Sequence, residues 1–194
     1  MGETATRRHG RASRRAFVEA TGALLRRQGY AATGLSEIVA ASGAPRGSLY
    51  FHFPGGKREL AVAAMEQTGE QLRAAIAALM AGPGGPAASL GVLIDALAAG
   101  LESSGYRDGC PIATVTLETA SSVEPLRETA ARVFGTWLEE LERALREDGL
   151  DADAAARRAL FVLSAIEGAL ILARARRDTA PLAAVRAELL AALA

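Results

Sequence analysis

Apolar residues recur along this chain with the spacing of helices, and the sharpest such pattern lies in residues 35–60. Leu35, Ile38 and Val39 fall at i, i+3 and i+4, so one side of a short helix is apolar. Gly43 suits the left-handed conformation that ends a helix. The pattern therefore predicts a short amphipathic helix that stops at this glycine.

A second short helix is expected directly after this corner. Pro45 suits the first turn of a helix, and Leu49 is expected to face inward. The polar side chains expected to face outward are Arg46, Ser48, Tyr50 and His52. A short helix that displays a guanidinium, a hydroxyl, a phenol and an imidazole is suited to the major groove of DNA. These two helices predict a DNA-binding helix-turn-helix.

The same periodicity predicts about nine helices in the whole chain and no strand of comparable quality. Glycine and proline give the boundaries, and the cluster at residues 82–86 is the clearest loop. Besides the two short helices, the expected spans are about 11–28, 56–81, a helix ending near 103, a short one from 111, and about 124–147, 151–177 and 181 onward. The expected fold class is all-α.

Composition agrees with a helical protein. Half of the residues are hydrophobic but only 5% are aromatic, and an Ala-, Leu- and Arg-rich chain favours helix. The single cysteine, Cys110, cannot form an internal disulfide, which is typical of a reducing compartment. Residues 1–15 are polar and Arg-rich, and charge or glycine interrupts the longest apolar stretches, so neither a signal peptide nor a transmembrane helix is expected. We therefore expect a cytoplasmic protein.

The net charge of zero hides an asymmetry between the two ends of the chain. Residues 1–60 contain ten basic and four acidic side chains, whereas residues 61–194 contain twelve basic and eighteen acidic ones. A basic N-terminal part suits a polyanionic partner at that end only. The alternative is that the arginines at positions 7, 8, 11, 14 and 15 form a solvated tail.

Residues 12–62 resemble the tetracycline-repressor-like (TetR) family of regulators. The matching residues are Phe17, Gly29, Tyr30, Thr33, Ile38, Gly43, Gly47, Leu49, Tyr50, Phe53, Lys57 and Leu60. The segment GCPIATVTLETA at 109–120 resembles the LmrA/YxaF branch of that family. One departure is the corner Pro54-Gly55-Gly56, which is one residue longer than in many relatives.

The resemblance implies an N-terminal helix-turn-helix three-helix domain, residues 1–56, with residues 1–10 expected to be disordered. It also implies a C-terminal helical domain, residues 57–194, for effector binding and dimerisation. Relatives couple effector binding to a pendulum-like shift of the fourth helix. The implied partners are a near-palindromic double-stranded DNA operator, a second copy of the chain and a small-molecule effector. No interaction with a membrane is expected.

Individual DNA contacts follow from side-chain chemistry together with this resemblance. Arg46 suits the O6 and N7 atoms of guanine, or else a phosphate. Lys57, the only lysine, is expected to join free backbone N–H groups in holding a phosphate. Thr33 is expected to cap a helix or to bind another phosphate. The expected contact set is Thr33, Pro45, Arg46, Gly47, Ser48, Tyr50, His52 and Lys57, whereas Phe51 and Phe53 are expected to pack.

The C-terminal part offers weaker signals for an effector pocket. The candidate lining residues are Met65, Met80, Tyr106, Cys110, Phe134 and Trp137, and the alternative for each is a place in the core. Two histidines and one cysteine give no metal-ligand spacing, and no catalytic motif is present. We therefore expect no enzyme, no cofactor and no metal.

The helix expected at 151–177 is too apolar for the surface of a monomer. The expected dimer-interface residues are Leu163, Ile166, Glu167, Gly168, Leu170 and Ile171. The alternatives are that this face is buried within one chain and that Glu167 lies in a pocket or faces water. A dimer would place two recognition helices about 34 Å apart, on successive major grooves.

These observations together predict a sequence-specific repressor that a small apolar or aromatic effector releases from its operator. The alternative is a protein that binds apolar ligands and has lost operator recognition.

Overall fold

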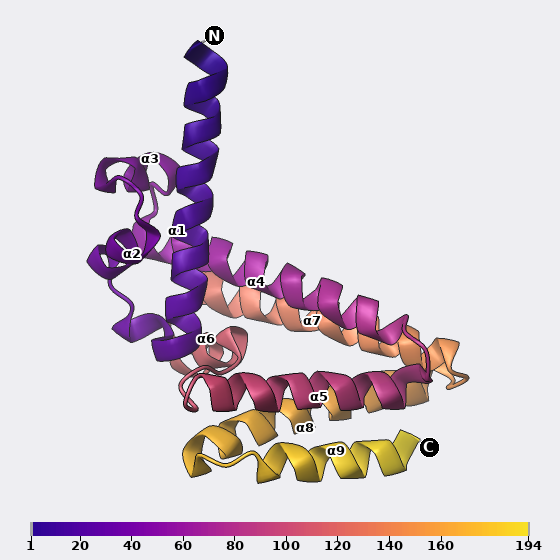
Figure 1. The fold of residues 1–194 in the computed structure, drawn as a ribbon. Helices are drawn as coiled ribbons and strands as arrows, with labels where there is room; N and C mark the ends of the chain where they lie inside the picture. Colours follow the sequence, from indigo (N-terminus) through magenta and orange to yellow (C-terminus); the bar gives the residue numbers. More distant parts are fainter. Residues whose placement is uncertain (1, 194) are drawn as a thin grey trace. The chain divides into compact units, whose positions relative to one another are not determined.

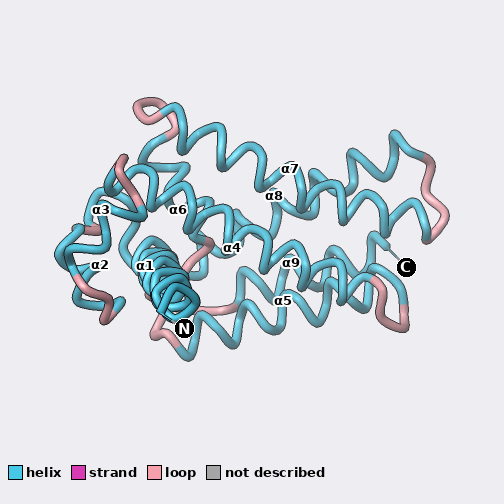
Figure 2. The backbone as a smooth tube through the Cα atoms, turned by 90° about the horizontal axis from the view of Figure 1, so that it is seen from above, coloured by secondary structure: helices cyan, strands magenta, loops and turns pink. Residues whose placement is uncertain are grey.

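The computed structural model describes residues 2–193, with side chains described for residues 10–193, and all regular secondary structure in this part of the chain is helical (Figure 1). It contains nine α-helices and one 3-10 turn: α1 (Gly2–Ala32), α2 (Leu35–Ser42), η1 (Arg46–Ser48), α3 (Leu49–His52), α4 (Gly56–Met80), α5 (Gly85–Ser103), α6 (Pro111–Thr119), α7 (Glu124–Glu147), α8 (Ala152–Arg176) and α9 (Ala180–Leu193). Figure 2 shows these helices joined by short loops. The all-α prediction is confirmed.

Local sequence signals set most helix ends. Gly43 ends α2 in the left-handed conformation, with φ 63°, and Gly149 adopts φ 110° in the corner between α7 and α8. Asp151 begins α8 because its carboxylate accepts a hydrogen bond of 2.8 Å from the backbone N–H of Ala154. The observed boundaries therefore lie close to those that glycine, proline and capping residues predict.

The first helix is longer than its apolar pattern predicts. It runs from Gly2 to Ala32, with a kink at Gly29, where the pattern ends the helix. Residues 2–10, for which the sequence suggests disorder, form its first turns. The side chains of residues 1–9, including two of the expected basic arginines, lie outside the described part of the chain.

The chain divides into two compact units. The first comprises residues up to 68 together with 111–131, and the second comprises 69–110 together with the residues from 132 onward. Helices α4 and α7 each contribute residues to both units.

The first unit has its own core, in which α1 packs against α2 and α6. The large side chains in this core are fully buried: Phe17, Leu25, Ile38, Leu49, Phe53, Leu60 and Met65. Burial of these side chains fixes the helix-turn-helix on the body of the unit, because each contributes about 1.5–3 kcal/mol on leaving water.

The second unit has a core centred on Trp137. This indole is almost fully buried and donates a hydrogen bond of 2.9 Å to the carbonyl oxygen of Gly69. The two helix backbones approach closely here, because a Cβ on Gly69 would lie 2.5 Å from Cγ1 of Val133. Glycine at position 69 therefore permits the packing of α4 against α7.

Helix α5 is the only described helix that is long and apolar enough, by length and composition, to cross a membrane. No such helix is expected from the sequence. In the second unit α5 packs along α9 (Figure 1). Between these helices, Asp95 forms an ion pair of 3.0 Å with Arg186. Its apolar composition is thus partly used in packing against another helix.

Candidate functional site

The corner between α2 and α3 presents polar side chains while it buries apolar ones. Arg46 and Gly47 are exposed and Tyr50 is 61% exposed, whereas Leu49 and Phe53 are only 2% and 1% exposed. Leu49 and Phe53 are four residues apart, so one edge of this short segment is anchored in the core and the other faces outward. The predicted inward position of Leu49 is confirmed.

The second short helix is less regular than the sequence suggests. Pro45 precedes one 3-10 turn, and only Leu49–His52 form α-helix. The hydroxyl of Ser48 donates a hydrogen bond of 2.7 Å to the carbonyl oxygen of Pro45, and the side chain of His52 is half-buried. Ser48 therefore has a local partner as well as an outward position.

Phe51 contradicts its expected packing role. Its side chain is 81% exposed, whereas Phe53 is buried as expected. Phe51 lies midway between the two anchoring positions of the short helix, so its side chain points away from the core. Its ring meets the ring of His52 edge-on, with 5.1 Å between centroids.

Thr33 does not cap α2, which is one of the two roles expected for it. Gly34 occupies the N-cap position, and no side-chain hydrogen bond caps the helix. The hydroxyl of Thr33 is buried and donates a hydrogen bond of 2.6 Å to the carbonyl oxygen of Gly29. The threonine therefore holds the chain that leaves the kink of α1.

Lys57 lies near the start of α4, as predicted, with its ammonium group occupied. Nζ donates a hydrogen bond of 3.3 Å to the carbonyl oxygen of Ala31 and lies 4.3 Å from the ring centroid of Tyr30. Just before the helix, the backbone N–H of Gly55 donates 2.7 Å to a carboxylate oxygen of Glu59. In this structure the ammonium group of Lys57 therefore contacts the end of α1.

The end of α1 is also held by a residue that no sequence pattern indicated. The Oε2 atom of Glu118, on α6, accepts a hydrogen bond of 2.7 Å from the backbone N–H of Ala31. Gly29 has φ 78° and ψ −174°, and a Cβ there would lie 1.6 Å from Oε1 of Glu118. Glu118 and Lys57 thus hold the two polar groups of the Ala31 residue, one on each side.

The described arginines of the expected N-terminal tail, Arg11, Arg14 and Arg15, lie on α1. Arg14 stacks over the ring of Phe53 at 5.3 Å, Arg15 pairs with Glu19 at 3.4 Å, and Arg11 is exposed. None of these contacts buries the charges, so the unit keeps a positively charged edge beside the helix-turn-helix.

The residues expected to line an effector pocket have different environments. Phe134 and Trp137 are in edge-to-face contact, with 5.4 Å between ring centroids. Met80 is buried, Tyr106 and Cys110 are half-buried, and Met65 belongs to the other unit. Trp137 is a core residue, which is the alternative that the sequence left open.

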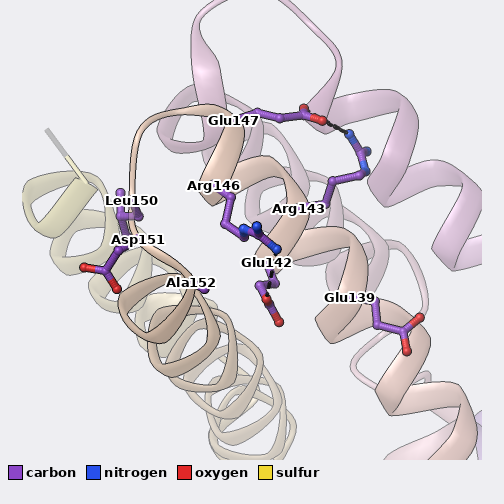
Figure 3. A pocket seen from close by; sticks show the side chains of 8 residues that line it. All are labelled: Glu139, Glu142, Arg143, Arg146, Glu147, Leu150, Asp151 and Ala152. Atoms are coloured by element: carbon purple, nitrogen blue, oxygen red, sulfur yellow. Dashed lines mark hydrogen bonds and ion pairs between the residues drawn. The ribbon is translucent and has the colours of Figure 1, made fainter.

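The second unit carries an open groove of about 590 Å³ at the corner between α7 and α8, and no expected effector residue lines it. Its lining residues are Glu139, Glu142, Arg143, Arg146, Glu147, Leu150, Asp151 and Ala152 (Figure 3). An ion pair of 2.9 Å joins Arg143 to Glu147, and Arg146 lies 3.9 Å from Glu142. A charged, ion-paired surface of this kind does not suit the apolar effector that the sequence predicts.

The expected dimer residues of α8 divide between two faces of the helix. Ile166 and Leu170 are buried within the chain, which contradicts their expected exposure, and Leu163 and Gly168 are half-buried. The large apolar side chains that remain exposed on α8 are Leu160, Phe161, Ile171 and Leu172. Apolar residues cover both faces of this helix, so their spacing alone does not identify the outer one.

The side chain of Glu167 is half-buried in the second unit. Burial raises the pKa of its carboxyl group, and a hydrogen bond with Cys110 opposes that rise. The Oε2 atom is buried and has no hydrogen-bond partner among the described residues. Its place beside Cys110 differs from the exposed position expected of an interface residue.

No group of three or more His, Cys, Asp or Glu side chains in the described part of the chain is arranged to hold a metal ion.

Comparison with known families places both halves of the chain. Residues 17–64 match the family described as bacterial regulatory proteins of the tetR family. Residues 86–188 match the family described as the C-terminal domain of LmrA/YxaF-like transcriptional regulators. The two matches lie in the same order as the helix-turn-helix and the C-terminal helices.

Similar proteins cover nearly the whole chain. The HTH-type transcriptional regulator LmrA of Bacillus subtilis is 34% identical over 170 residues, which cover 88% of this chain and 90% of that protein. An uncharacterised HTH-type regulator of Mycobacterium tuberculosis is 36% identical over 181 residues, 91% of each chain. The crystal structure of a TetR regulator from Chloroflexus aurantiacus matches with a TM-score of 0.77 and 30% identity over 95% of both chains.

These relatives are transcriptional regulators and not enzymes. The exposed helix-turn-helix in the first unit is the element that gives such proteins their DNA-binding function. This chain therefore belongs to the tetracycline-repressor-like (TetR) family of DNA-binding transcriptional regulators, in its LmrA/YxaF-like branch.

Proposed function

We propose that this regulator is a cytoplasmic repressor that binds a near-palindromic operator as a homodimer and is released by a small apolar or aromatic effector. The observation that carries the DNA-binding part is the division of the recognition segment, in which Leu49 and Phe53 are buried while Arg46 and Tyr50 face outward. An anchored helix with an outward guanidinium and phenol fits the major groove.

The proposed DNA contacts keep most of the set that the sequence suggests. They are Pro45, Arg46, Gly47, Ser48, Tyr50, His52 and Lys57. Arg46 is proposed to read guanine, and Lys57 to exchange its contacts at Ala31 and Tyr30 for a phosphate. Thr33 is proposed to act indirectly, because its buried hydroxyl is already bonded to Gly29.

Selection from a random duplex library tests sequence-specific binding. We expect a near-palindrome whose half-sites lie about one helical turn, roughly 34 Å, apart. A protein that binds apolar ligands but enriches no sequence would support loss of operator recognition in place of the repressor function. A promoter fused to the selected operator should then be silenced by the protein in a reporter strain, and activation of that promoter would contradict repression.

Two substitutions then test the proposed contacts. Arg46→Ala should cost about 1–3 kcal/mol and relax the preference at one symmetric base pair, if the arginine reads guanine. Lys57→Ala should weaken binding to all sequences and reduce the salt slope by about one unit per subunit. Arg146→Ala, which removes an equal charge from the last turn of α7, is the matched control and should leave binding unchanged. Equal losses for Arg46→Ala on operator and random DNA would make it a phosphate contact.

We propose that residues 1–56 bind DNA and that residues 57–194 bind effector and dimerise. Support for dimerisation comes from the exposed apolar side chains of α8, which leave a stripe unpartnered in one chain. Light scattering at micromolar concentration should give a dimer, and a folded monomer would reject this part of the proposal.

The effector is proposed to bind the second unit, in the region of Tyr106, Cys110 and Phe134. It must bind the form with lower DNA affinity more tightly, since equal binding to both forms shifts nothing. A screen of apolar and aromatic compounds should yield some that release operator DNA over the same concentration range in which they bind. Compounds that bind without changing operator affinity would contradict the switch and leave DNA binding intact.

A further inference from the structure

Phe51 is the most exposed large apolar side chain in the described part of the chain, at 81%. It is not a loosely packed core residue, because the anchoring positions on either side of it, Leu49 and Phe53, are fully buried. The backbone that carries it is therefore fixed, and the ring is presented outward by a well-anchored turn. At this exposure the ring is not covered by other side chains of the described residues.

The neighbours of Phe51 belong to the same outward surface. Tyr50 is exposed beside it, His52 meets its ring edge-on, and Arg46 and Gly47 are exposed one helical turn before it. A Cβ on Gly47 would meet nothing within 4 Å, so this surface is open. No acidic residue occurs in the segment 45–53, so the segment that carries the aromatic ring offers hydrogen-bond donors and no carboxylate.

The major groove offers one apolar group that matches such a ring. Its base edges carry hydrogen-bond donors and acceptors, and thymine adds a C5 methyl group. The guanidinium, phenol and imidazole of the segment serve the polar edges, whereas a phenyl ring can form no hydrogen bond with them. Apolar contact with the thymine methyl is the remaining form of base recognition open to Phe51.

We propose that Phe51 is a specificity-determining residue that contacts a thymine methyl in each operator half-site. This inference rests on the proposed DNA binding, and it deepens that proposal by naming one base that the operator must contain. The protein would then recognise thymine through an apolar contact, independently of the hydrogen bonds proposed for Arg46.

Replacing thymine by deoxyuridine tests the contact directly, because the exchange removes only the methyl group and keeps every hydrogen-bonding atom. The selected operator would be prepared with each thymine replaced in turn, at both symmetric positions, and its affinity for the full-length dimer measured at one salt concentration. At one position the wild type should lose about 4-fold per methyl, and about 15-fold for both half-sites, as expected for one buried methyl each.

Variants at position 51 assign this loss to the ring. Phe51→Ala should bind the thymine and deoxyuridine operators within about 2-fold of each other, while Phe51→Leu, which keeps an apolar side chain, should retain part of the discrimination. Leu117→Ala is the matched control, because it removes an exposed large apolar side chain outside the recognition segment and should keep the full thymine dependence. Since Phe51 is exposed, all these variants should keep the helical content of the wild type, as circular dichroism will show.

The outcomes separate this inference from the function on which it rests. A wild type that binds its operator selectively but tolerates deoxyuridine at every position overturns the role of Phe51 and leaves the regulator function intact. Discrimination that persists in Phe51→Ala also overturns it and assigns the methyl contact to another residue. A wild type that selects no sequence defeats both proposals. If Phe51→Ala binds DNA too weakly to measure, Phe51→Leu provides the test. Discrimination between the thymine and deoxyuridine operators by Phe51→Leu that equals that of the wild type would contradict contact by the ring.

Discussion

Gly29 is the position where a single methyl group should disturb the first unit most. Its backbone has φ 78° and ψ −174°, a conformation that is essentially restricted to glycine. A Cβ would lie 1.6 Å from Oε1 and 2.7 Å from Cδ of Glu118. Gly29→Ala must therefore strain the backbone and also displace the carboxylate that accepts the Ala31 N–H.

The expected loss has two parts. Holding a non-glycine residue in this conformation costs about 1–3 kcal/mol. Losing the hydrogen bond from Ala31 to the solvent-exposed Glu118 carboxylate costs about 0.5–1.5 kcal/mol. Gly29→Ala should thus lower the free energy of unfolding by about 1.5–4.5 kcal/mol, a large share of the roughly 5–15 kcal/mol typical of a folded domain.

Urea denaturation followed by circular dichroism, at one fixed protein concentration, measures this loss. Glu118→Ala alone should cost only the hydrogen bond. In the Glu118→Ala background, Gly29→Ala should cost only the backbone strain, so the two changes should not be additive. Gly47→Ala is the control, because Gly47 has open space around it and should change stability little.

Two results would refute this reasoning. A loss below about 1 kcal/mol for Gly29→Ala would mean that the backbone is not restricted to glycine as its angles indicate. An equal loss with and without the Glu118 carboxylate would mean that the steric conflict between them contributes nothing.

Three other predictions follow from particular contacts. Gly69→Ala should lower the free energy of unfolding by about 1–3 kcal/mol, because its Cβ would meet Val133. Gly135, in α7, has open space around it, so Gly135→Ala should raise the free energy of unfolding by up to about 1 kcal/mol. Equal effects of the two substitutions in urea denaturation would contradict this prediction. Gly168→Leu fills open space on α8 and should weaken the dimer and operator binding together, as light scattering and a binding titration will test. Burial raises the pKa of Glu167, so the contribution of its carboxyl group to the free energy of unfolding is fully present at acidic pH and is lost as pH rises through the raised pKa. Glu167→Gln should flatten this pH dependence and gain stability relative to the wild type at neutral pH. Parallel profiles of the free energy of unfolding against pH for the two proteins would contradict this prediction.

Sequence patterns predicted the helices well because the signals that end a helix are local. Gly43 and Pro111 act within a turn of their own positions, and the structure has helix boundaries beside each of them. Leu49 and Phe53 were predictable as core because i and i+4 positions share a face. Phe51 was not, because a helix of four residues is too short for its period to show which aromatic faces outward.

Contacts between distant parts of the chain left no such signal. Glu118 and Ala31 are 87 positions apart, and a lone glutamate on an amphipathic helix looks like a solvated residue. On α8 both faces are apolar, so spacing did not separate Ile166, which is buried, from Phe161, which is exposed. Which side chains are buried and which distant residues are in contact depends on how the helices pack together.

The contact between Lys57 and the end of α1 has a practical consequence. Apart from the terminal amine, Lys57 carries the only primary amine of the chain, and that amine is half-covered by the Tyr30 ring and hydrogen-bonded to Ala31. An amine-reactive reagent therefore modifies the side chains of this protein at a single position, next to the recognition segment. The rate of that modification reports how often the amine of Lys57 leaves its contacts with Ala31 and Tyr30. The same rate therefore measures how often this amine is free to bind a phosphate.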